Sequence, residues 1–260
     1  MVTVRKDDLK EIENGVLVLT RKAQYKSMEG DRGKFFHATD FVNECNRNLF
    51  YSKIVPRGTM DTKTMTIFWV GHAIHNVTPI SQDMKYHEMK MAYDFVDDKV
   101  LDIKNLDAIS KEKYFDIVVG TCDDVVQVMV GGNKEWCIVD KKTWRSKGYK
   151  KTSPSQNHIE QVGIYRLLLE KCEGIVIPYG AIVYFDMWQE GVEKPQVIPF
   201  KIDSPDITRG KMLKIRDTIL ESQKTGILPD RYIHWKCNGY CPYAERCFNE
   251  EIVEKGAIKF

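Results

Sequence analysis

The residues best suited to chemistry lie at the end of an apolar run, in the segment Trp136-Cys137-Ile138-Val139-Asp140-Lys141-Lys142-Thr143. The run predicts a strand, in which alternate residues share a face and rise about 3.3 Å each. Asp140 and Lys142 then point the same way, with their α-carbons about 6.6 Å apart. A carboxylate that holds a metal, beside an ammonium that meets developing negative charge, is a minimal arrangement for phosphodiester hydrolysis. Acid–lysine pairs at strand ends are also common as surface salt bridges.

A second carboxylate reaches the same face through a predicted hairpin. The apolar alternation that precedes Gly131-Gly132-Asn133-Lys134 ends in this hairpin turn signal. A two-residue turn at the glycines places Asp123 opposite Asp140, whereas a four-residue loop places it opposite Lys142. Both registers put Asp123 on the face of Asp140 and Lys142 and send Asp124 to the other face. A loop of odd length or a bulge would reverse that choice.

Length and composition predict one large globular domain, or one domain with a small appendage. The 260 residues are 43% hydrophobic and 29% charged, with a formal net charge of +2, so overall charge alone does not indicate nucleic acid. No run approaches the roughly 18 apolar residues that span a bilayer, and the first residues lack the apolar core of a signal peptide. We therefore expect a cytoplasmic protein without a membrane segment. Its seven cysteines are expected to be thiols or metal ligands rather than disulfides.

The rest of the chain predicts alternating helices and strands that surround this pair. Helices are expected at about 39–50, 61–77, 83–96, 155–171 and 206–223, and strands at about 15–19, 117–120, 125–130, 136–143, 179–187 and 196–202. The segment 226–229 reads as a linker. In the helix that Ser155 opens, Gln161 and Tyr165 lie four residues apart on one face. On spacing alone, Gln161 could equally be an exposed helix former, and Tyr165 could equally be a residue of the core.

A basic loop follows the predicted catalytic strand. Residues 141–151 hold six basic residues and no acidic one, with Trp144 and Tyr149 among them. Such a loop suits a polyanion backbone and unstacked bases, although a solvated charged loop has the same composition. The candidate phosphate contacts are Arg47, Lys141, Arg145 and Lys150.

Three cysteines near the C-terminus indicate a metal. Cys237, Cys241 and Cys247 fall within eleven residues, one ligand short of the four thiolates that an iron–sulfur cube or a tetrahedral zinc site takes. Cys45 is the leading candidate for the fourth, because its neighbours are polar and in a predicted helix. Spacing does not distinguish iron–sulfur from zinc. Apolar surroundings predict inert buried thiols for Cys122, Cys137 and Cys172.

The motifs together resemble a known family. Their order along the chain is Cys45, Gly71-x3-His75, Gly120-x2-Asp123-x-Val125, Asp140-x-Lys142-Thr143, Gln161-x3-Tyr165, and then the three C-terminal cysteines. This order resembles the RecB-like PD-(D/E)XK nucleases, and among them the iron–sulfur exonucleases called CRISPR-associated protein four and their virus-borne or stand-alone relatives. The resemblance spans residues from about 39 to 248. The chain departs from the usual pattern in the three-residue gap after Cys237 and in the Asp, rather than Glu, of its D-x-K.

The resemblance implies a fold, cofactors and a substrate. The fold is α/β, a restriction-endonuclease-like mixed sheet flanked by helices over residues 1–228, with a cysteine-rich iron–sulfur region over 229–260. The cofactors are a 4Fe–4S cluster, held by Cys45 and the C-terminal trio, and Mg²⁺ or Mn²⁺. The implied activity is exonuclease cleavage of single-stranded DNA, which processes DNA ends in antiviral CRISPR adaptation beside the integrase. A homo-oligomer is compatible with this reading.

The implied mechanism assigns roles to the motif residues. Asp123, Asp140 and His75 hold the divalent cation, and Lys142 orients the attacking water or stabilises the charge on phosphorus. Gln161 and Tyr165 position Lys142 and the DNA backbone.

Other interpretations fit parts of the pattern. On a helix, His75 alone reads as a core histidine, and His72 is a rival on a neighbouring face. The whole chain also fits a non-catalytic DNA-binding or scaffold protein with a structural metal. A third reading is an accessory subunit that is active only within an adaptation, recombination, repair or viral complex. The presence of Asp123, Asp140 and Lys142 together favours the enzyme.

Overall fold

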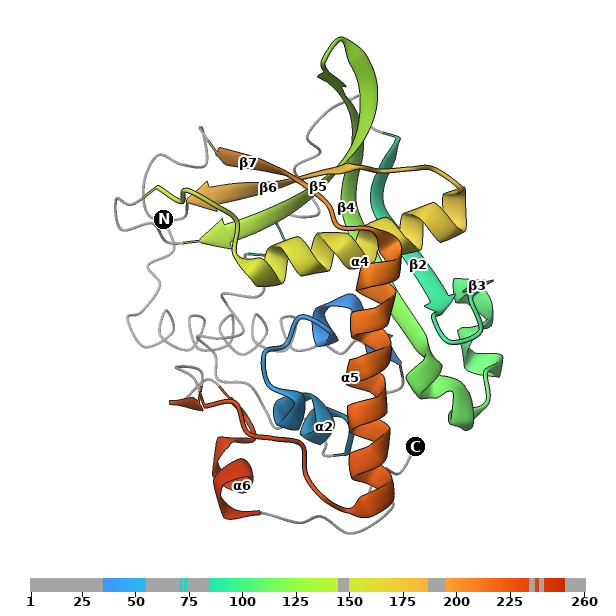
Figure 1. The fold of residues 1–260 in the computed structure, drawn as a ribbon, viewed down its shortest axis with the longest axis vertical. Coiled ribbons are helices and arrows are strands. Elements are labelled where there is room, and N and C mark those ends of the chain that lie inside the picture. The colour runs from blue at the N-terminus through green and yellow to red at the C-terminus, as the bar shows by residue number, and fades with distance from the viewer. Residues whose placement is uncertain are drawn as a thin grey trace, which may run out of the picture.

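The computed structural model describes residues 35–54, 71, 73, 85–144, 150–186, 195–233, 237–238 and 241–250, which form a sheet flanked by helices (Figure 1). The strands are β1 (Phe36–His37), β2 (Tyr86–Asp94), β3 (Lys99–Leu101), β4 (Ile117–Val130), β5 (Asn133–Trp144), β6 (Tyr179–Asp186) and β7 (Gln196–Lys201). The α-helices are α2 (Asn46–Ile54), α4 (Gln156–Glu173), α5 (Pro205–Thr225) and α6 (Ala244–Asn249). Short 3-10 helices are η1 (Ala38–Asp40), η2 (Ile103–Ala108) and η3 (Lys111–Asp116).

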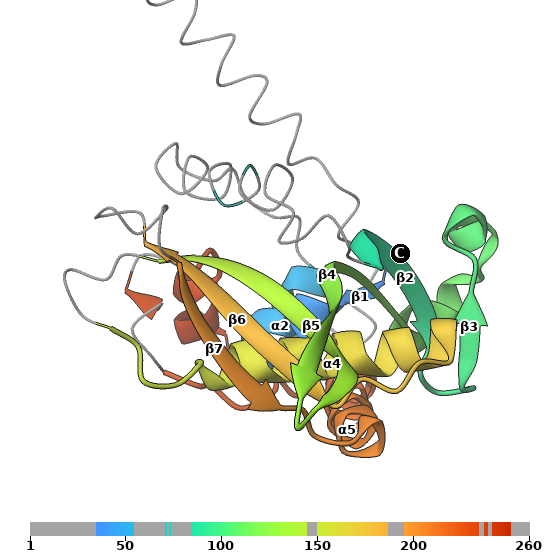
Figure 2. The ribbon, with the colours of Figure 1, turned by 90° about the horizontal axis from the view of Figure 1, so that it is seen from above.

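The strands of the described part form one mixed sheet in the order β3-β2-β4-β5-β6-β7, with β1 beside β4. The pairs β1–β4 and β5–β6 are parallel, and the other pairs are antiparallel. Parallel neighbours require a crossover connection, and α4 supplies it between β5 and β6. Figures 1 and 2 show α4 along one face of the sheet, with α5 crossing α4 on the side away from the sheet. The predicted mixed α/β fold is confirmed at this level.

The β4–β5 hairpin has the two-residue turn that one of the two registers required. Gly131 and Gly132 have φ of 57° and 87°, the positive values that a type I′ hairpin turn needs at both central residues. The backbone pairing runs from Val130 opposite Asn133 down to Asp124 opposite Val139. Continuing this register places Asp123 opposite Asp140, as predicted for the shorter turn.

Glycines let α4 lie close to the sheet. A Cβ on Gly120 would meet Leu168 and Tyr165 of α4 at 3.1 and 3.2 Å, and one on Gly180 would meet Val162 at 2.8 Å. The helix starts after Ser155, as predicted, and ends at Gly174 in the left-handed conformation (φ 67°). Absence of a side chain at two strand positions therefore sets how near α4 comes to β4 and β6.

Of the other predicted elements, some are confirmed, one begins later than predicted, and some lie outside the described residues. The expected strands at 179–187 and 196–202 and the helix at 206–223 are confirmed by β6, β7 and α5. The helix expected at 39–50 instead begins at Asn46, after η1. The predicted strand at 15–19 lies outside the described residues, as does the segment expected to be helical at 61–77 apart from Gly71 and Ala73, which are helical.

The helix predicted at 83–96 is wrong, because most of this segment is strand β2. Its Met and Tyr residues fit a helical stripe, yet Met91 and Tyr93 alternate with period two and pack into the main core. Pairing with both β3 and β4 satisfies the backbone of this segment. A short apolar pattern is ambiguous between the two periods, and the neighbouring strands decide it.

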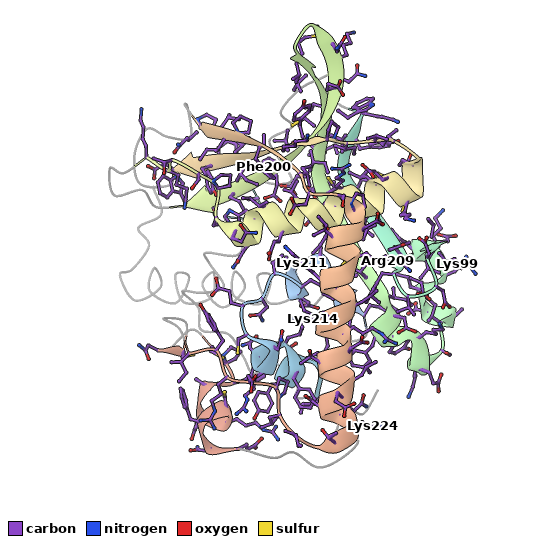
Figure 3. The ribbon with its side chains drawn as sticks, viewed as in Figure 1. Lys99, Phe200, Arg209, Lys211, Lys214 and Lys224 are labelled. Atoms are coloured by element: carbon purple, nitrogen blue, oxygen red, sulfur yellow. The ribbon has the colours of Figure 1, made fainter. Side chains whose placement is uncertain are left out.

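A partly buried arginine of helix α5 makes hydrogen bonds to the residues that follow β2. The Arg209 guanidinium donates to the backbone carbonyls of Phe95 and Val96 at 2.7 and 2.9 Å, while Lys211, Lys214 and Lys224 lie along the same helix (Figure 3).

No helix in the described residues combines the length and apolar character needed to cross a membrane.

Candidate active site

Three carboxylates lie in one row across β2, β4 and β5. Glu88 and Asp123 lie between the paired residues His87–Asp124 and Met89–Cys122, and so fall opposite each other. The hairpin register, continued by one residue from Asp124 opposite Val139, brings Asp123 opposite Asp140. Directly opposite side chains in antiparallel strands have Cβ atoms about 4.5–5.5 Å apart. All three acids also act on one buried thiol, since the pKa of Cys122 is raised well above its ordinary value by burial first and then by nearby carboxylates that include these three.

Two strands of this row, β4 and β2, depart from regular alternation at the acids. In β4, Cys122 and Val125 both pack on the main core although they are three residues apart, and in β2 the same holds for Tyr86 and Met89. Glu88 between them has φ of 48°, a left-handed conformation that residues other than glycine rarely adopt. Strain of this kind is concentrated at functional sites, and here it accompanies the row of acids.

Lys142 lies beside the row, on the face that the strand pattern predicts, and forms an ion pair with Asp140. Its Nζ is 3.0 and 2.8 Å from the two carboxylate oxygens of Asp140. The Asp140 side chain is 1% exposed and that of Lys142 is 19% exposed, so the lysine is the partner that solvent reaches. The Oδ2 of Asp123 accepts a hydrogen bond of 2.7 Å from the backbone N–H of Lys141, which fixes this carboxylate on the β5 side.

Helix α4 brings Gln161 and Tyr165 to the same site. The Gln161 side-chain amide donates to the Tyr165 hydroxyl at 2.7 Å, and both residues are buried. Burial, followed by the charge of Asp140, raises the pKa of Tyr165 well above its ordinary value. The hydroxyl therefore stays protonated and can act as a donor beside the carboxylates. The structure brings together the predicted residues Asp123, Asp140, Lys142, Gln161 and Tyr165.

The opposite face of the hairpin holds a second acid–lysine pair. Lys141 and Asp124 are fully buried, with Nζ 3.2 Å from Oδ2, and His87 Nδ1 lies 2.6 Å from Asp124 Oδ1. The predicted phosphate contact of Lys141 is therefore wrong, because its ammonium is sealed inside the protein and paired. A long basic side chain in a charged segment predicts exposure, but β5 places every second residue beneath the sheet.

The predicted phosphate contact of Arg47 is also wrong. Arg47 is buried, and its guanidinium donates to the carbonyl of Pro229 at 2.7 Å and to those of Cys247 and Glu250 at 3.4 Å. It fastens α2 to the C-terminal segment. Lys150 is exposed, as a phosphate contact requires. His75, its rival His72, and Arg145 lie outside the described residues.

Cys45, Cys237, Cys241 and Cys247 line one cavity between α2 and the C-terminal segment, and all four are free thiols. Asn48 donates to two of them, from its backbone N–H to Cys45 Sγ at 3.4 Å and from its side chain to Cys241 Sγ at 3.1 Å. As the side chains stand, no three His, Cys, Asp or Glu residues of the described chain are arranged to hold a metal ion. The structure places Cys45 beside the C-terminal trio, and their shared ligation of a cluster stays a prediction.

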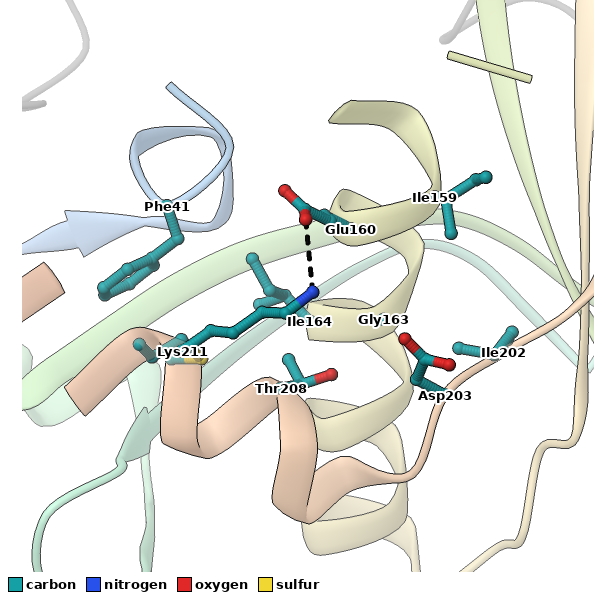
Figure 4. Close-up of a pocket in the computed structure, with 10 residues that line it drawn as sticks. Phe41, Ile159, Glu160, Gly163, Ile164, Ile202, Asp203, Thr208 and Lys211 are labelled. Atoms are coloured by element: carbon teal, nitrogen blue, oxygen red, sulfur yellow. Dashed lines mark hydrogen bonds and ion pairs between the residues drawn. The ribbon is translucent and has the colours of Figure 1, made fainter. Parts of the chain in front are cut away.

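A separate crevice lies where α4 and α5 cross (Figure 4). Glu160 and Lys211 form an ion pair of 3.2 Å there, above the side chains of Ile164 and Thr208. None of the residues that line it belongs to the predicted catalytic set. The crevice is a helix-packing feature and not the active site.

Glu88 is the residue that sequence reasoning missed. Its segment was predicted as a helix, in which one more acid among charged residues carries no signal. Reading Tyr86–Asp94 as a strand antiparallel to β4 would have placed Glu88 opposite Asp123.

Comparison with known proteins identifies the family. The model of the PD-(D/E)XK nuclease superfamily matches residues 43–248, most of the chain, so the protein belongs to this superfamily. No curated protein matches the sequence. Among solved structures, the crystal structure of SSO0001 is similar with a TM-score of 0.52 at 14% identity, over 90% of this chain and 96% of that chain. At this identity the similarity concerns the fold.

An alkaline exonuclease, LHK-Exo from Laribacter hongkongensis, is a more distant structural neighbour. Its crystal structure has a TM-score of 0.43 at 10% identity, over 74% of this chain and 88% of that chain. Its complex with dAMP gives 0.42 at 11% identity, over 73% and 87%.

Proposed function

We propose that this protein is a metal-dependent deoxyribonuclease that acts as an exonuclease on single-stranded DNA. The observation that carries the proposal is the row of Glu88, Asp123 and Asp140 with Lys142 at its solvent-facing side, in a chain of a nuclease superfamily. A role in CRISPR adaptation beside an integrase remains a prediction from the sequence resemblance.

The donor set of the row fits a hard divalent cation. Carboxylate oxygens are the ligands that Mg²⁺ prefers, and an imidazole ligand, as the sequence predicts for His75, suits Mn²⁺. Glu88 Oε1 is buried and has no hydrogen-bond partner in the described structure, a costly state for a carboxylate unless a cation is bound. Glu88, Asp123 and Asp140 would hold the ion after a rearrangement of their side chains, because as they stand no three acids of the described residues are arranged to hold a metal. A bound ion would lower the pKa of water and screen the phosphate.

The protein's own side chains position the substrate around this row. The Lys142 ammonium is paired with Asp140. If a bound cation balanced the Asp140 charge, the ammonium would be free to contact a phosphate oxygen and stabilise developing negative charge there. The Tyr165 hydroxyl, held by Gln161 and kept protonated by its surroundings, donates a hydrogen bond beside the acids. Burial of Asp140 and Tyr165 excludes water from the inner side of the site.

The proposal includes an iron–sulfur cluster on the four cysteines. Free thiols in one cavity, with N–H donors aimed at two of the sulfurs, fit a thiolate-bound cluster. Such a cluster would join α2 to the C-terminal segment, a junction that Arg47 already makes with hydrogen bonds.

The nuclease proposal is tested with purified protein, Mn²⁺ and end-labelled single-stranded, duplex and circular DNA. We expect cleavage of linear single strands, little cleavage of circles, and loss of cleavage with EDTA or in Asp140→Ala. Glu160→Gln removes an acid of the α4–α5 crevice and should leave cleavage unchanged. Full activity of Asp140→Ala would overturn the proposed site, and rapid cleavage of circles would overturn the exonuclease assignment.

The cluster proposal is tested by metal analysis and visible absorption of anaerobically purified protein. Iron and sulfide with a brown colour are expected, together with a lower melting temperature in Cys45→Ser, because metal affinity is folding free energy. A colourless protein that contains zinc would contradict the iron–sulfur assignment.

A further inference from the structure

The face that carries Lys142 continues to a half-buried indole. Trp144 follows Lys142 by two residues in β5, so the two side chains leave the same face about 6.6 Å apart. In the neighbouring strand β6, Tyr184 pairs with Lys142. Its ring centroid lies 6.0 Å from that of Trp144. A polar and aromatic surface therefore starts directly beside the proposed catalytic lysine.

Tyr184 is the buried support of this surface. It is 1% exposed, its hydroxyl accepts a hydrogen bond of 3.3 Å from the backbone N–H of Ser155, and it lies 2.9 Å from His158 Nδ1. These bonds fix the first turn of α4, and with it His158, against β6. Trp144 and His158 are the half-exposed side chains that pack on Tyr184.

Lys151 completes the surface as a cation held in place. Its Nζ lies 5.1 Å from the ring centroid of Trp144 and 5.0 Å from that of Tyr184, within the range of cation–π attraction. Its backbone N–H donates to Gln196 Oε1 at 3.0 Å, and Gln196 Nε2 donates back to its carbonyl. Within the described residues Lys151 forms no ion pair with a carboxylate.

Lys142 and Lys151 both lie near His158. Burial first, and then the charges of Lys142 and Lys151, lower the pKa of His158 to about 4. The imidazole is therefore neutral at physiological pH, close to two ammonium groups. Two lysines, a neutral imidazole and a partly exposed indole are the groups that bind a phosphate together with a base.

We propose that Trp144, Lys151 and His158 form a subsite for the unpaired nucleotide next to the scissile phosphate. Lys151 binds the phosphate of that nucleotide, and Trp144 packs against its base. A base inside a duplex is stacked on both sides and cannot present its face to Trp144, so the subsite selects single strands. The inference rests on the proposed nuclease function and names the strand form that the same site accepts.

The test measures binding separately from cleavage. Dissociation constants for labelled oligo(dT) and for duplex DNA are obtained by fluorescence anisotropy, with Ca²⁺ in place of Mn²⁺ to suppress turnover. The variants are Trp144→Ala, Trp144→Phe, Lys151→Gln, and Lys104→Gln as an exposed control far along the chain in η2. Thermal unfolding checks that each variant is folded.

We expect Trp144→Ala to weaken single-strand binding about 10-fold, as loss of one stacked base does, and to leave duplex binding unchanged. Trp144→Phe should retain most of the affinity because it keeps an aromatic face. Lys151→Gln should reduce the slope of log affinity against log salt by about 0.7, the value for one single-strand phosphate contact.

Two further arms identify the contacts. An oligonucleotide with one abasic position beside the cleavage point should bind wild type and Trp144→Ala equally. An oligonucleotide with a neutral methylphosphonate at the neighbouring linkage should bind wild type and Lys151→Gln equally. Wild-type affinity in both Trp144→Ala and Lys151→Gln would overturn the subsite. Absence of cleavage by the wild type, with binding still lost in these variants, would instead overturn the nuclease function.

Discussion

Two acid–lysine pairs lie back to back on the β4–β5 hairpin and differ in what can reach them. Asp140 and Lys142 face α4, with the lysine 19% exposed, whereas Asp124 and Lys141 face the other side with both side chains fully buried. The two sets are neighbours in sequence and use the same residue types. Only the open pair can exchange its partner for a substrate.

Strand β5 contributes to stability through one face and to the proposed chemistry through the other. Lys141 donates its backbone N–H to Asp123 on the open side, and its side-chain ammonium forms an ion pair with Asp124 on the sealed side. Taking two charges out of water is costly, and a buried pair is retained only while both partners and their hydrogen bonds are present. The sealed pair therefore fixes the strand whose other face carries the catalytic groups.

The largest expected effect is on the open side, in Asp140→Asn. Cleavage should fall by at least about 1,000-fold, since the charge that a metal supplies to the reaction is worth several kcal/mol. Stability should change less than when one partner of the sealed pair is removed, because the lysine that is left is 19% exposed and water can solvate it. Single-turnover cleavage and urea unfolding measure the two quantities. A loss of several kcal/mol in stability would mean that the open pair is structural like the sealed one.

Lys141→Met, on the sealed side, should have its main effect on stability. It leaves Asp124 buried without its lysine, and we expect the free energy of unfolding to fall by about 3–5 kcal/mol. Replacing both partners, in Lys141→Met with Asp124→Leu, should recover much of that loss. Lys142→Met is the matched control on the open side, where water reaches the pair, and should lower the free energy of unfolding by less than Lys141→Met does. Equal destabilisation by the two lysine substitutions would remove the contrast between the faces.

Glu88→Gln tests whether the open side extends to β2. Affinity for Mn²⁺, measured by isothermal titration, should fall at least about 10-fold, because one anionic ligand is replaced by a neutral one. Cleavage should recover partly at high Mn²⁺ concentration. Unchanged Mn²⁺ affinity would show that the cation is held without β2.

The smallest expected effect concerns pH and His158. Its pKa is lowered to about 4 in the folded protein from an ordinary 6.5, so between these values the unfolded chain binds the proton more tightly. Stability should therefore fall as pH falls from about 6.5 to 4, by on the order of 1–2 kcal/mol after allowance for partial exposure. Urea unfolding at pH 7 and 4.5 should show a smaller loss in His158→Gln. Equal losses in both proteins would contradict this assignment.

Much of the open face was predictable because its determinants are local. Two glycines of positive φ define the hairpin turn, the turn defines the register, and the register puts Asp123 beside Asp140. Helical spacing likewise brings Gln161 to Tyr165. These geometric predictions need only the period of a strand or helix and the chemistry of a turn.

Contacts distant in sequence decided the rest. The segment Tyr86–Asp94 fits a helical stripe by itself and becomes a strand because β3 and β4 pair with it, which also brings Glu88 to the site. Arg47 reads as a surface cation until carbonyls of the C-terminal segment surround it.

Which side chains share a face follows from the sequence, because alternation along a strand and spacing along a helix are properties of the local backbone. Which face is open follows from tertiary packing. Burial of Lys141 and access to Lys142 depend on the elements packed against each side of the sheet, and these come from distant parts of the chain. The difference between a structural ion pair and a catalytic one is therefore set by packing rather than by residue type.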